Sequence, residues 1–133
     1  MHSPHEHPIF ASTISAGFPS QADDYIENRI DLNEHLVQHK EATFFLRVKG
    51  DSMTQLGILD GDLLVVDRSL PVVDGNIVIA VIDGEFTVKQ LQHRQGGYVL
   101  KAANPAYPDI IIPPDGNLEV WGVVRWAIHR LWP

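Results

Sequence analysis

Residues 77–91 read IVIAVIDGEFTVKQL, and this stretch decides the fold class. It holds two runs rich in β-branched and other apolar residues on either side of the pair Asp83-Gly84. An Asp-Gly pair between two such runs favours a two-residue hairpin turn, because both residues tolerate a positive φ. The stretch therefore predicts two antiparallel strands, residues 77–82 and 85–91, joined by a tight turn.

The chain repeats this pattern from residue 43 onward. Short apolar runs alternate with Gly, Pro and Asn, which are typical of turns. The other runs that we expect to form strands are residues 43–49, 63–66, 98–101, 109–112 and 118–128. Together with the hairpin they make about seven strands, so we expect a mainly β domain, either barrel-like or a folded sheet.

The first 22 residues differ from the rest. Prolines at positions 4, 8 and 19 interrupt them, and Ser, Thr and Gly are frequent. We expect residues 1–22 to form a flexible arm and residues 23–133 to form one domain. Within the arm, residues 9–14 are β-prone and could add to a sheet edge or a groove as an extended strand. After it, Asp31 and Glu34 have the spacing of a helix cap, which predicts a short helix over residues 31–38.

Composition narrows the function classes. A chain of 133 residues can bury the core of one domain. It carries 17 acidic and 10 basic residues, and the basic ones are scattered, which disfavours tight DNA binding by this chain alone. The lack of cysteine excludes disulfides, thiolate metal sites and cysteine nucleophiles. No apolar run reaches the length of about 20 residues that spans a bilayer, so we expect a soluble, cytoplasmic protein.

Ser52 is the best placed of six serines to act as a nucleophile. It follows Gly50-Asp51 at the end of an expected strand, where a glycine allows a sharp turn that exposes the hydroxyl and gathers backbone N–H groups. A Gly-Asp-Ser turn by itself is more often only a turn. The sequence alone leaves both interpretations open.

Lys89 is the candidate base for that serine. No histidine lies beside an obvious orienting acid, and of four lysines only Lys89 lies within an apolar strand, between Val88 and Leu91. Burial lowers the pKa of a lysine and so makes it a competent base. The alternative is that Lys89 extends from an edge strand to water, and the pattern alone does not exclude it.

A set of motifs that covers most of the chain resembles the LexA/UmuD self-cleaving family, and within it the UmuD-type proteins. The motifs are Gly17-Phe18-Pro19-Ser20, Asp23-Asp24-Tyr25, Arg29-Ile30-Asp31-Leu32-Asn33, Gly50-Asp51-Ser52-Met53, Gly57-Ile58, residues 60–67 (DGDLLVVD) and residues 83–89 (DGEFTVK).

The resemblance implies a serine/lysine peptidase that cuts itself. Ser52 would be the nucleophile and Lys89, 37 residues later, its base. The scissile bond would be Ala16–Gly17, where LexA-like members also have Ala–Gly and UmuD itself has Cys–Gly. The small side chains leave room for the carbonyl to approach Ser52. The resemblance also implies an oxyanion hole formed by the backbone N–H groups of Asp51 and Ser52.

The same resemblance implies a cellular role. Such proteins stay dormant until a RecA filament on single-stranded DNA favours cleavage. The shortened product, a homodimer, then joins a Y-family, UmuC-like DNA polymerase in error-prone lesion bypass during the SOS response. No cofactor and no metal are expected.

Three alternatives are weighed against this one. A LexA-like repressor shares the protease half but needs a helix-turn-helix domain before the scissile bond, where only 16 residues stand. A type I signal peptidase also uses Ser and Lys but needs a membrane anchor. A binding module with a vestigial dyad stays open, because an intact serine and lysine do not prove catalysis.

Other motifs are expected to be structural. His2, His5 and His7 lie in a Pro-broken tail that fits no defined metal site. Asp60-Gly61-Asp62 lacks most ligands of a calcium loop and is interpreted as a turn. Three tryptophans near the end of the chain, Trp121, Trp126 and Trp132, are expected in the core or at a two-fold interface.

Overall fold

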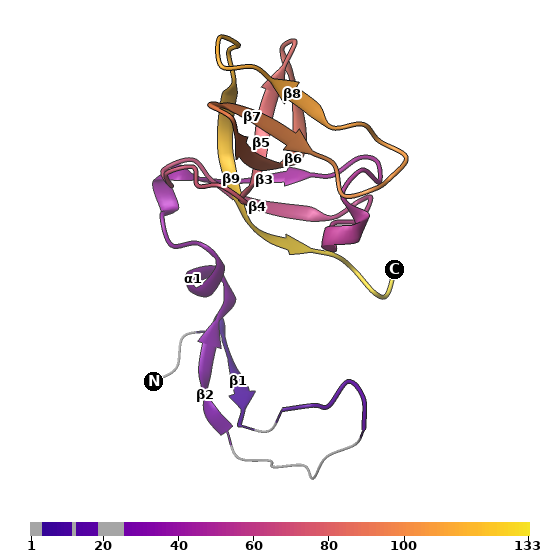
Figure 1. The fold of residues 1–133 in the computed structure, drawn as a ribbon. Helices are drawn as coiled ribbons and strands as arrows, with labels where there is room; N and C mark the ends of the chain where they lie inside the picture. Colours follow the sequence, from indigo (N-terminus) through magenta and orange to yellow (C-terminus); the bar gives the residue numbers. More distant parts are fainter. Residues whose placement is uncertain (1–3, 12, 19–25) are drawn as a thin grey trace. The chain divides into compact units, whose positions relative to one another are not determined.

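The computed structural model describes residues 4–11, 13–18 and 26–133 of the chain (Figure 1). It divides into two compact units, Met1–Gln38 and His39–Pro133. The expected arm, residues 1–22, falls within the first unit, and residues 19–22 of the arm lie outside the described residues.

The described residues of the first unit form two antiparallel strands and one short helix. Strand β1 (Glu6–Phe10) pairs with β2 (Ile26–Asp31), with Glu6 opposite Asp31. The β-prone stretch expected at residues 9–14 thus forms a strand only through Phe10, and β2 was not predicted because polar residues interrupt its apolar pattern. Helix α1 (Leu32–Leu36) begins after Asp31, whose carboxylate accepts hydrogen bonds from the N–H groups of Asn33 and Glu34. The expected cap is confirmed, and the helix ends two residues early.

The second unit is built on a seven-stranded sheet in which all neighbours are antiparallel, with the order β3-β4-β9-β5-β6-β7-β8. This confirms the expected mainly β fold. The strands are β3 (Thr43–Arg47), β4 (Leu63–Asp67), β5 (Ile77–Ile82), β6 (Glu85–Arg94), β7 (Gly97–Lys101), β8 (Ile110–Ile112) and β9 (Glu119–Ile128).

The hairpin predicted for residues 77–91 is confirmed. Asp83 and Gly84 both have positive φ, 50° and 78°, and join β5 to β6 with Ile82 opposite Glu85. Positive φ at both central residues is the geometry whose twist matches that of the flanking strands. A second turn of the same kind, Gln95-Gly96, joins β6 to β7.

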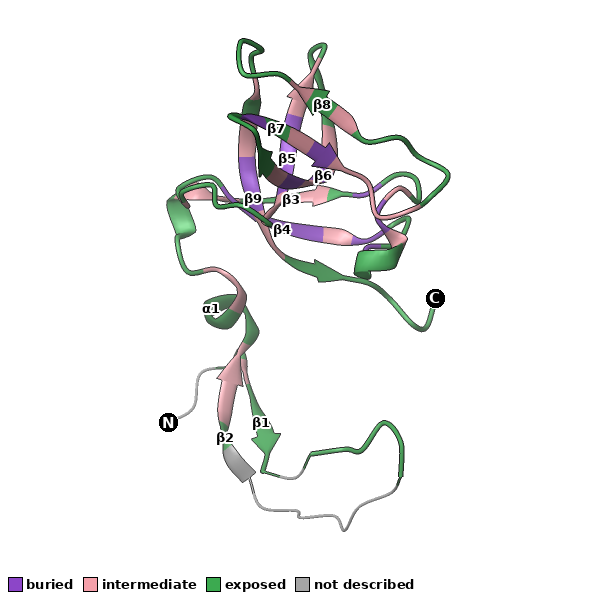
Figure 2. Ribbon diagram, in the orientation of Figure 1, coloured by how far each residue is buried: buried purple, intermediate pink, exposed green. Residues whose placement is uncertain are grey.

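The core of the second unit covers both faces of β5. Ile79 packs in one buried cluster with Met53 and Val66, whereas Val78 and Ala80 pack in the other. Successive side chains of a strand point to opposite faces, so a strand buried on both faces needs a continuous apolar run. Figure 2 shows β4, β5 and the middle of β9 as the most buried part of this unit. Near the middle of β6, Lys89 contacts Ser52 in the connection between β3 and β4.

Candidate active site

The turn that carries Ser52 follows β3 directly. Gly50 has φ +99°, a conformation that side chains rarely adopt, so a glycine is needed there. Its N–H donates to the Asp60 carboxylate at 2.7 Å, which holds the turn against the loop before β4. Ser52 is half-buried, and the following Met53 is anchored in the core with 1% exposure. The backbone turn therefore holds the Ser52 hydroxyl in a fixed position.

Lys89 reaches this turn from the middle of β6. Its Nζ donates a hydrogen bond to Ser52 Oγ at 3.1 Å and a second one to the carbonyl oxygen of Val88 at 3.2 Å. The side chain is only 7% exposed. The structure thus brings the two residues singled out from the sequence into direct contact, and Lys89 does not extend to water.

The surroundings of Lys89 favour its neutral form. Burial lowers the pKa of the Lys89 amine from its ordinary value, because the ammonium loses hydration. No carboxylate of the described residues forms an ion pair with it. Its two partners are a hydroxyl and a carbonyl, both neutral acceptors. A lysine in this setting can accept a proton from the serine that it contacts.

The backbone around Ser52 offers free donors. Within the described part of the chain, the N–H groups of Asp51 and Ser52 donate to no other group. Unpaired N–H groups beside a nucleophile can stabilise an oxyanion. These are the two groups that the resemblance assigned to the oxyanion hole.

Two hollows lie beside Ser52. One, of about 240 Å³, has a mainly apolar lining that includes Leu46, Ile79 and Val88. The other, of about 370 Å³, is lined by Lys89, Thr87, the turn residues 49–52 and residues 107, 108 and 110 of the β7–β8 region. Ser52 lines both, so an extended segment that crossed the hydroxyl would pass beside both hollows.

The expected scissile bond lies in the first unit. Ala16 and Gly17 are both exposed, and the Gly17 N–H donates to Ser15 Oγ at 3.3 Å. Ile14 and Phe18 on either side are 96% and 89% exposed. Exposed apolar side chains that flank a small-residue bond could be buried when the segment docks in a groove.

Sequence reasoning missed the residues that hold the Ser52 turn from the β7–β8 connection. The Ala103 N–H donates to the carbonyl oxygen of Ser52 at 2.7 Å, and the Asn104 amide donates to that of Asp51 at 2.8 Å. The Tyr107 hydroxyl donates to the Asp51 carboxylate at 2.6 Å. These contacts link positions more than fifty residues apart, and no pattern in the sequence pairs them.

His93, the alternative base by sequence, lies near the end of β6. Its ring packs 5.1 Å from that of Tyr98, and its backbone N–H donates to Asp74. Lys89 is therefore the residue of β6 whose side chain the structure places on Ser52.

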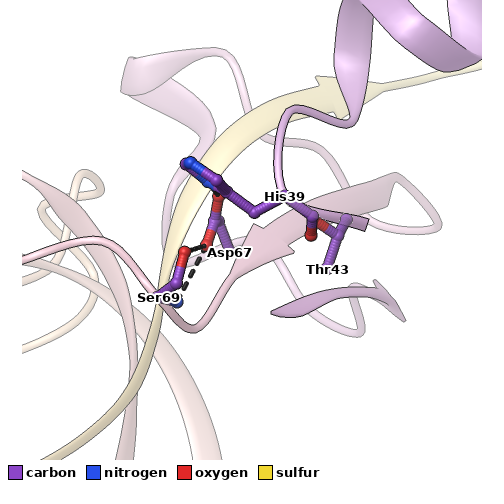
Figure 3. Close-up of polar contacts among 4 residues, drawn as sticks. All are labelled: His39, Thr43, Asp67 and Ser69. Atoms are coloured by element: carbon purple, nitrogen blue, oxygen red, sulfur yellow. Dashed lines mark hydrogen bonds and ion pairs between the residues drawn. The ribbon is translucent and has the colours of Figure 1, made fainter. Parts of the chain in front are cut away.

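A second cluster of Ser, Asp and His lies at the end of β4 (Figure 3). Asp67 is buried at 1% exposure and accepts hydrogen bonds from Ser69 and from His39 Nδ1. Burial disfavours the charged carboxylate, but the hydrogen bonds outweigh it and lower the pKa of Asp67 to about 2. The carboxylate stands between the hydroxyl and the imidazole, so this cluster fastens the start of the second unit to β4 and does not activate a nucleophile.

The other motifs have structural surroundings. Asp60 and Asp62 accept backbone hydrogen bonds within and beside their turn. Among the residues that the structure describes, no three His, Asp or Glu side chains gather to hold a metal ion; His2 lies outside them. Trp121 packs against the first core cluster, whereas Trp132 is 84% exposed. No helix among the described residues is long and apolar enough to cross a membrane.

Comparison with known proteins gives a family match over most of the chain. The sequence model of the family described as Peptidase S24-like matches residues 8–125. Protein MucA of Escherichia coli is 48% identical over 93% of this chain and 85% of its own length. Protein SamA of Salmonella typhimurium is 46% identical over 92% of this chain and 85% of its own length.

A repressor also matches, but less completely. LexA repressor 2 of Pseudomonas syringae is 43% identical over 75% of this chain, and the match spans 53% of the repressor. A match over that share of the chain includes both Ser52 and Lys89.

Proposed function

The chain belongs to the Peptidase S24-like family of self-cleaving serine peptidases, and we propose that Ser52 and Lys89 cut the chain's own Ala16–Gly17 bond. The observation that carries the proposal is the 3.1 Å hydrogen bond between Lys89 Nζ and Ser52 Oγ in a buried setting without a counter-ion. A neutral amine in contact with a hydroxyl is the arrangement that general-base activation of serine needs.

The reaction follows from these groups. Neutral Lys89 accepts the Ser52 proton while Oγ attacks the carbonyl carbon of Ala16, and the N–H groups of Asp51 and Ser52 stabilise the oxyanion. When the tetrahedral intermediate collapses, the C–N bond breaks and the Lys89 ammonium gives its proton to the departing amine of Gly17. Water, deprotonated by Lys89, then hydrolyses the acyl-serine and restores the hydroxyl.

Docking of the arm supplies the substrate. The hollows beside Ser52 can take the residues that flank Ala16 and Gly17, and the exposed Ile14 and Phe18 have apolar surface to bury there. A substrate on the same chain, or on the partner in a dimer, is present at high effective concentration, so a modest catalyst suffices. Control then lies in how often the arm docks.

As a UmuD-like member of this family, the chain is an accessory protein of SOS mutagenesis. Beyond that, the resemblance supports activation by a RecA filament, a cytoplasmic homodimer as the shortened product, and delivery of that product to a Y-family polymerase. Exposed apolar residues near the chain's end, Ile128, Leu131 and Trp132, are suited to a two-fold interface. The repressor matches a smaller share of this chain, 75% against 92% for protein SamA, which favours the accessory role over a repressor.

Replacement of either dyad residue tests the proposal. Ser52→Ala and Lys89→Ala should each abolish cleavage in the presence of RecA, single-stranded DNA and a nucleotide, with the sheet still folded by circular dichroism. Cleavage of Ser52→Ala at the wild-type rate would reject the mechanism. A wild-type protein that never cuts under activating conditions would favour a binding module with a vestigial dyad.

A further inference from the structure

The connection between β7 and β8 forms hydrogen bonds with Asp51 and with the nucleophile Ser52. Asn104 Nδ2 donates to the Asp51 carbonyl at 2.8 Å, the Ala103 N–H donates to the Ser52 carbonyl at 2.7 Å, and the Tyr107 hydroxyl donates to Asp51 Oδ1 at 2.6 Å. Three short hydrogen bonds from one turn thus converge on two consecutive residues.

Peptide geometry gives the Asn104 contact a chemical meaning. The Asp51 carbonyl and the Ser52 N–H belong to the same planar, trans peptide group and point in opposite directions. A donor that fixes the carbonyl therefore fixes where the N–H points. The Ser52 N–H donates to nothing else in the described chain, and it is one of the two proposed oxyanion donors. Asn104 thereby fixes the direction of the Ser52 N–H without contacting the substrate.

The Asn104 side chain is itself held in one orientation. Its Oδ1 accepts from the Ala106 N–H at 2.9 Å, and its backbone carbonyl accepts from the Tyr107 N–H at 3.0 Å. The amide oxygen is thus engaged by its own turn, which leaves the NH₂ group to face Asp51. This position needs a side chain that accepts from the Ala106 N–H and donates to the Asp51 carbonyl, and Asn does both.

Tyr107 holds the side chain of Asp51, whereas Asn104 holds its backbone carbonyl. Its hydroxyl holds the Asp51 side chain, and the residue also lines the hollow that contains Ser52 and Lys89. The hydrogen bond to Asp51 raises the pKa of the Tyr107 phenol, so the hydroxyl remains a donor to a higher pH than an ordinary tyrosine would.

We propose that Asn104 and Tyr107 are positioning residues that preorganise the oxyanion-stabilising N–H of Ser52. The role rests on the proposed function of the Ser52 and Lys89 pair and deepens it. Removal of one oxyanion donor lowers enzymatic rates by about 10²–10³-fold. If the Ser52 N–H is present but free to turn away, the rate should fall less than if it were removed. We therefore expect the rate to fall by about ten- to a hundredfold when the Asn104 donor is lost, and by a few fold when the Tyr107 hydroxyl is lost.

The decisive variant is Asn104→Asp. A carboxylate keeps the acceptor for the Ala106 N–H but loses the donor and sets an oxygen against the Asp51 carbonyl oxygen. Asn117→Asp is the matched control, because Asn117 is exposed and forms no hydrogen bond within the described chain, and the change in charge is the same. Tyr107→Phe removes only a hydroxyl and should preserve the fold.

Two reactions are measured on the full-length variants. One is self-cleavage at the alkaline plateau of each variant, so that an effect of the new charge on Lys89 ionisation does not enter. The other is labelling of Ser52 by diisopropyl fluorophosphate, whose phosphoryl oxygen occupies the oxyanion position and which needs no arm docking. Melting temperatures by circular dichroism report on the fold. We expect both rates to fall together in Asn104→Asp, and to a smaller extent in Tyr107→Phe, with Asn117→Asp like wild type.

The outcomes separate the two proposals. If the wild type reacts in both assays and Asn104→Asp reacts equally fast, the positioning role is wrong while the dyad stands. If Asn104→Asp does not fold, Tyr107→Phe decides, and wild-type rates in it overturn the role. A wild type that neither cleaves nor takes the label on Ser52 overturns the dyad and the positioning role together.

Discussion

A change of pH should act on Lys89 in two measurements at once. Lys89 is 7% exposed, the hydrogen-bond partners of its amine are neutral, and burial lowers the pKa of the amine from the ordinary value. Only the neutral amine can accept the Ser52 proton. Cleavage without an activator should therefore be slow near neutral pH and accelerate on moving toward about pH 9 to 10, as the amine loses its proton.

The size of both effects follows from one ionisation. Below the folded-state pKa the rate should change tenfold per pH unit, because the neutral fraction does. The same ionisation makes stability depend on pH. The folded pKa lies below the unfolded value of about 10.4, so between the two the unfolded chain binds a proton that the folded chain has lost. The free energy of unfolding should thus rise by about 1.4 kcal/mol per pH unit across that window.

The assay pairs kinetics with unfolding. Single-turnover cleavage is followed against pH in wild type and in Lys89→Arg, which stays charged throughout. Urea unfolding is followed in Ser52→Ala, which cannot cut itself, and in Ser52→Ala/Lys89→Met, which lacks the amine. The double variant should lose the alkaline gain in stability. It should also be no less stable than Ser52→Ala near pH 7, because Met fills a similar volume without the cost of a buried charge.

Three results would refute this reasoning. A wild-type rate that is already flat by pH 7.5 without activator would indicate a base with a lower pKa, such as histidine. An alkaline rise that persists in Lys89→Arg would assign the ionisation to another group. Equal pH dependence of stability in the two unfolding variants would show that Lys89 stays solvated and keeps its ordinary pKa.

Two further predictions concern the scaffold, each measured by urea unfolding in the Ser52→Ala background. Gly97→Ala should lower the free energy of unfolding by about 1–3 kcal/mol, because the added Cβ would lie 2.5 Å from the Ile112 carbonyl oxygen, and an unchanged value would contradict the close packing of β7 on β8. The lowered pKa of Asp67, about 2 against 3.8, should contribute about 2 kcal/mol of stability that is present above pH 4 and lost as pH falls through about 2. Asp67→Asn should lack this acid-dependent loss, and an identical acid profile would contradict the contacts of His39 and Ser69 with the carboxylate.

The sequence predicted those parts of the fold that local chemistry decides. The Asp83-Gly84 turn follows from the tolerance of both residues for positive φ, and the cap of α1 follows from the Asp31 side chain alone. Strand β2 was missed because Asn28 and Arg29 interrupt its apolar pattern and its partner β1 lies far along the chain. Pairing between distant segments is a tertiary property that a local pattern does not contain.

The site residues also fall into those that a local pattern indicates and those that only the folded structure brings together. Ser52 was recognisable from its glycine turn, and Lys89 from its apolar strand, although the pattern alone left a structural interpretation open for both. Asn104 and Tyr107 were not recognised, because an Asn-Pro-Ala-Tyr segment is a common turn and its contact with Asp51 exists only after the sheet has formed. Residues that act through another residue leave little trace in a single sequence.

The position of the cut tests directly whether Ser52 cleaves the Ala16–Gly17 bond. Purified wild-type protein and Ser52→Ala are incubated at alkaline pH and, separately, with RecA, single-stranded DNA and a nucleotide, and the products are identified by intact mass and N-terminal sequencing. We expect one new fragment that begins at Gly17, formed by wild type and absent from Ser52→Ala. A fragment that begins at any other residue, or the same fragment from Ser52→Ala, would contradict cleavage of this bond by Ser52.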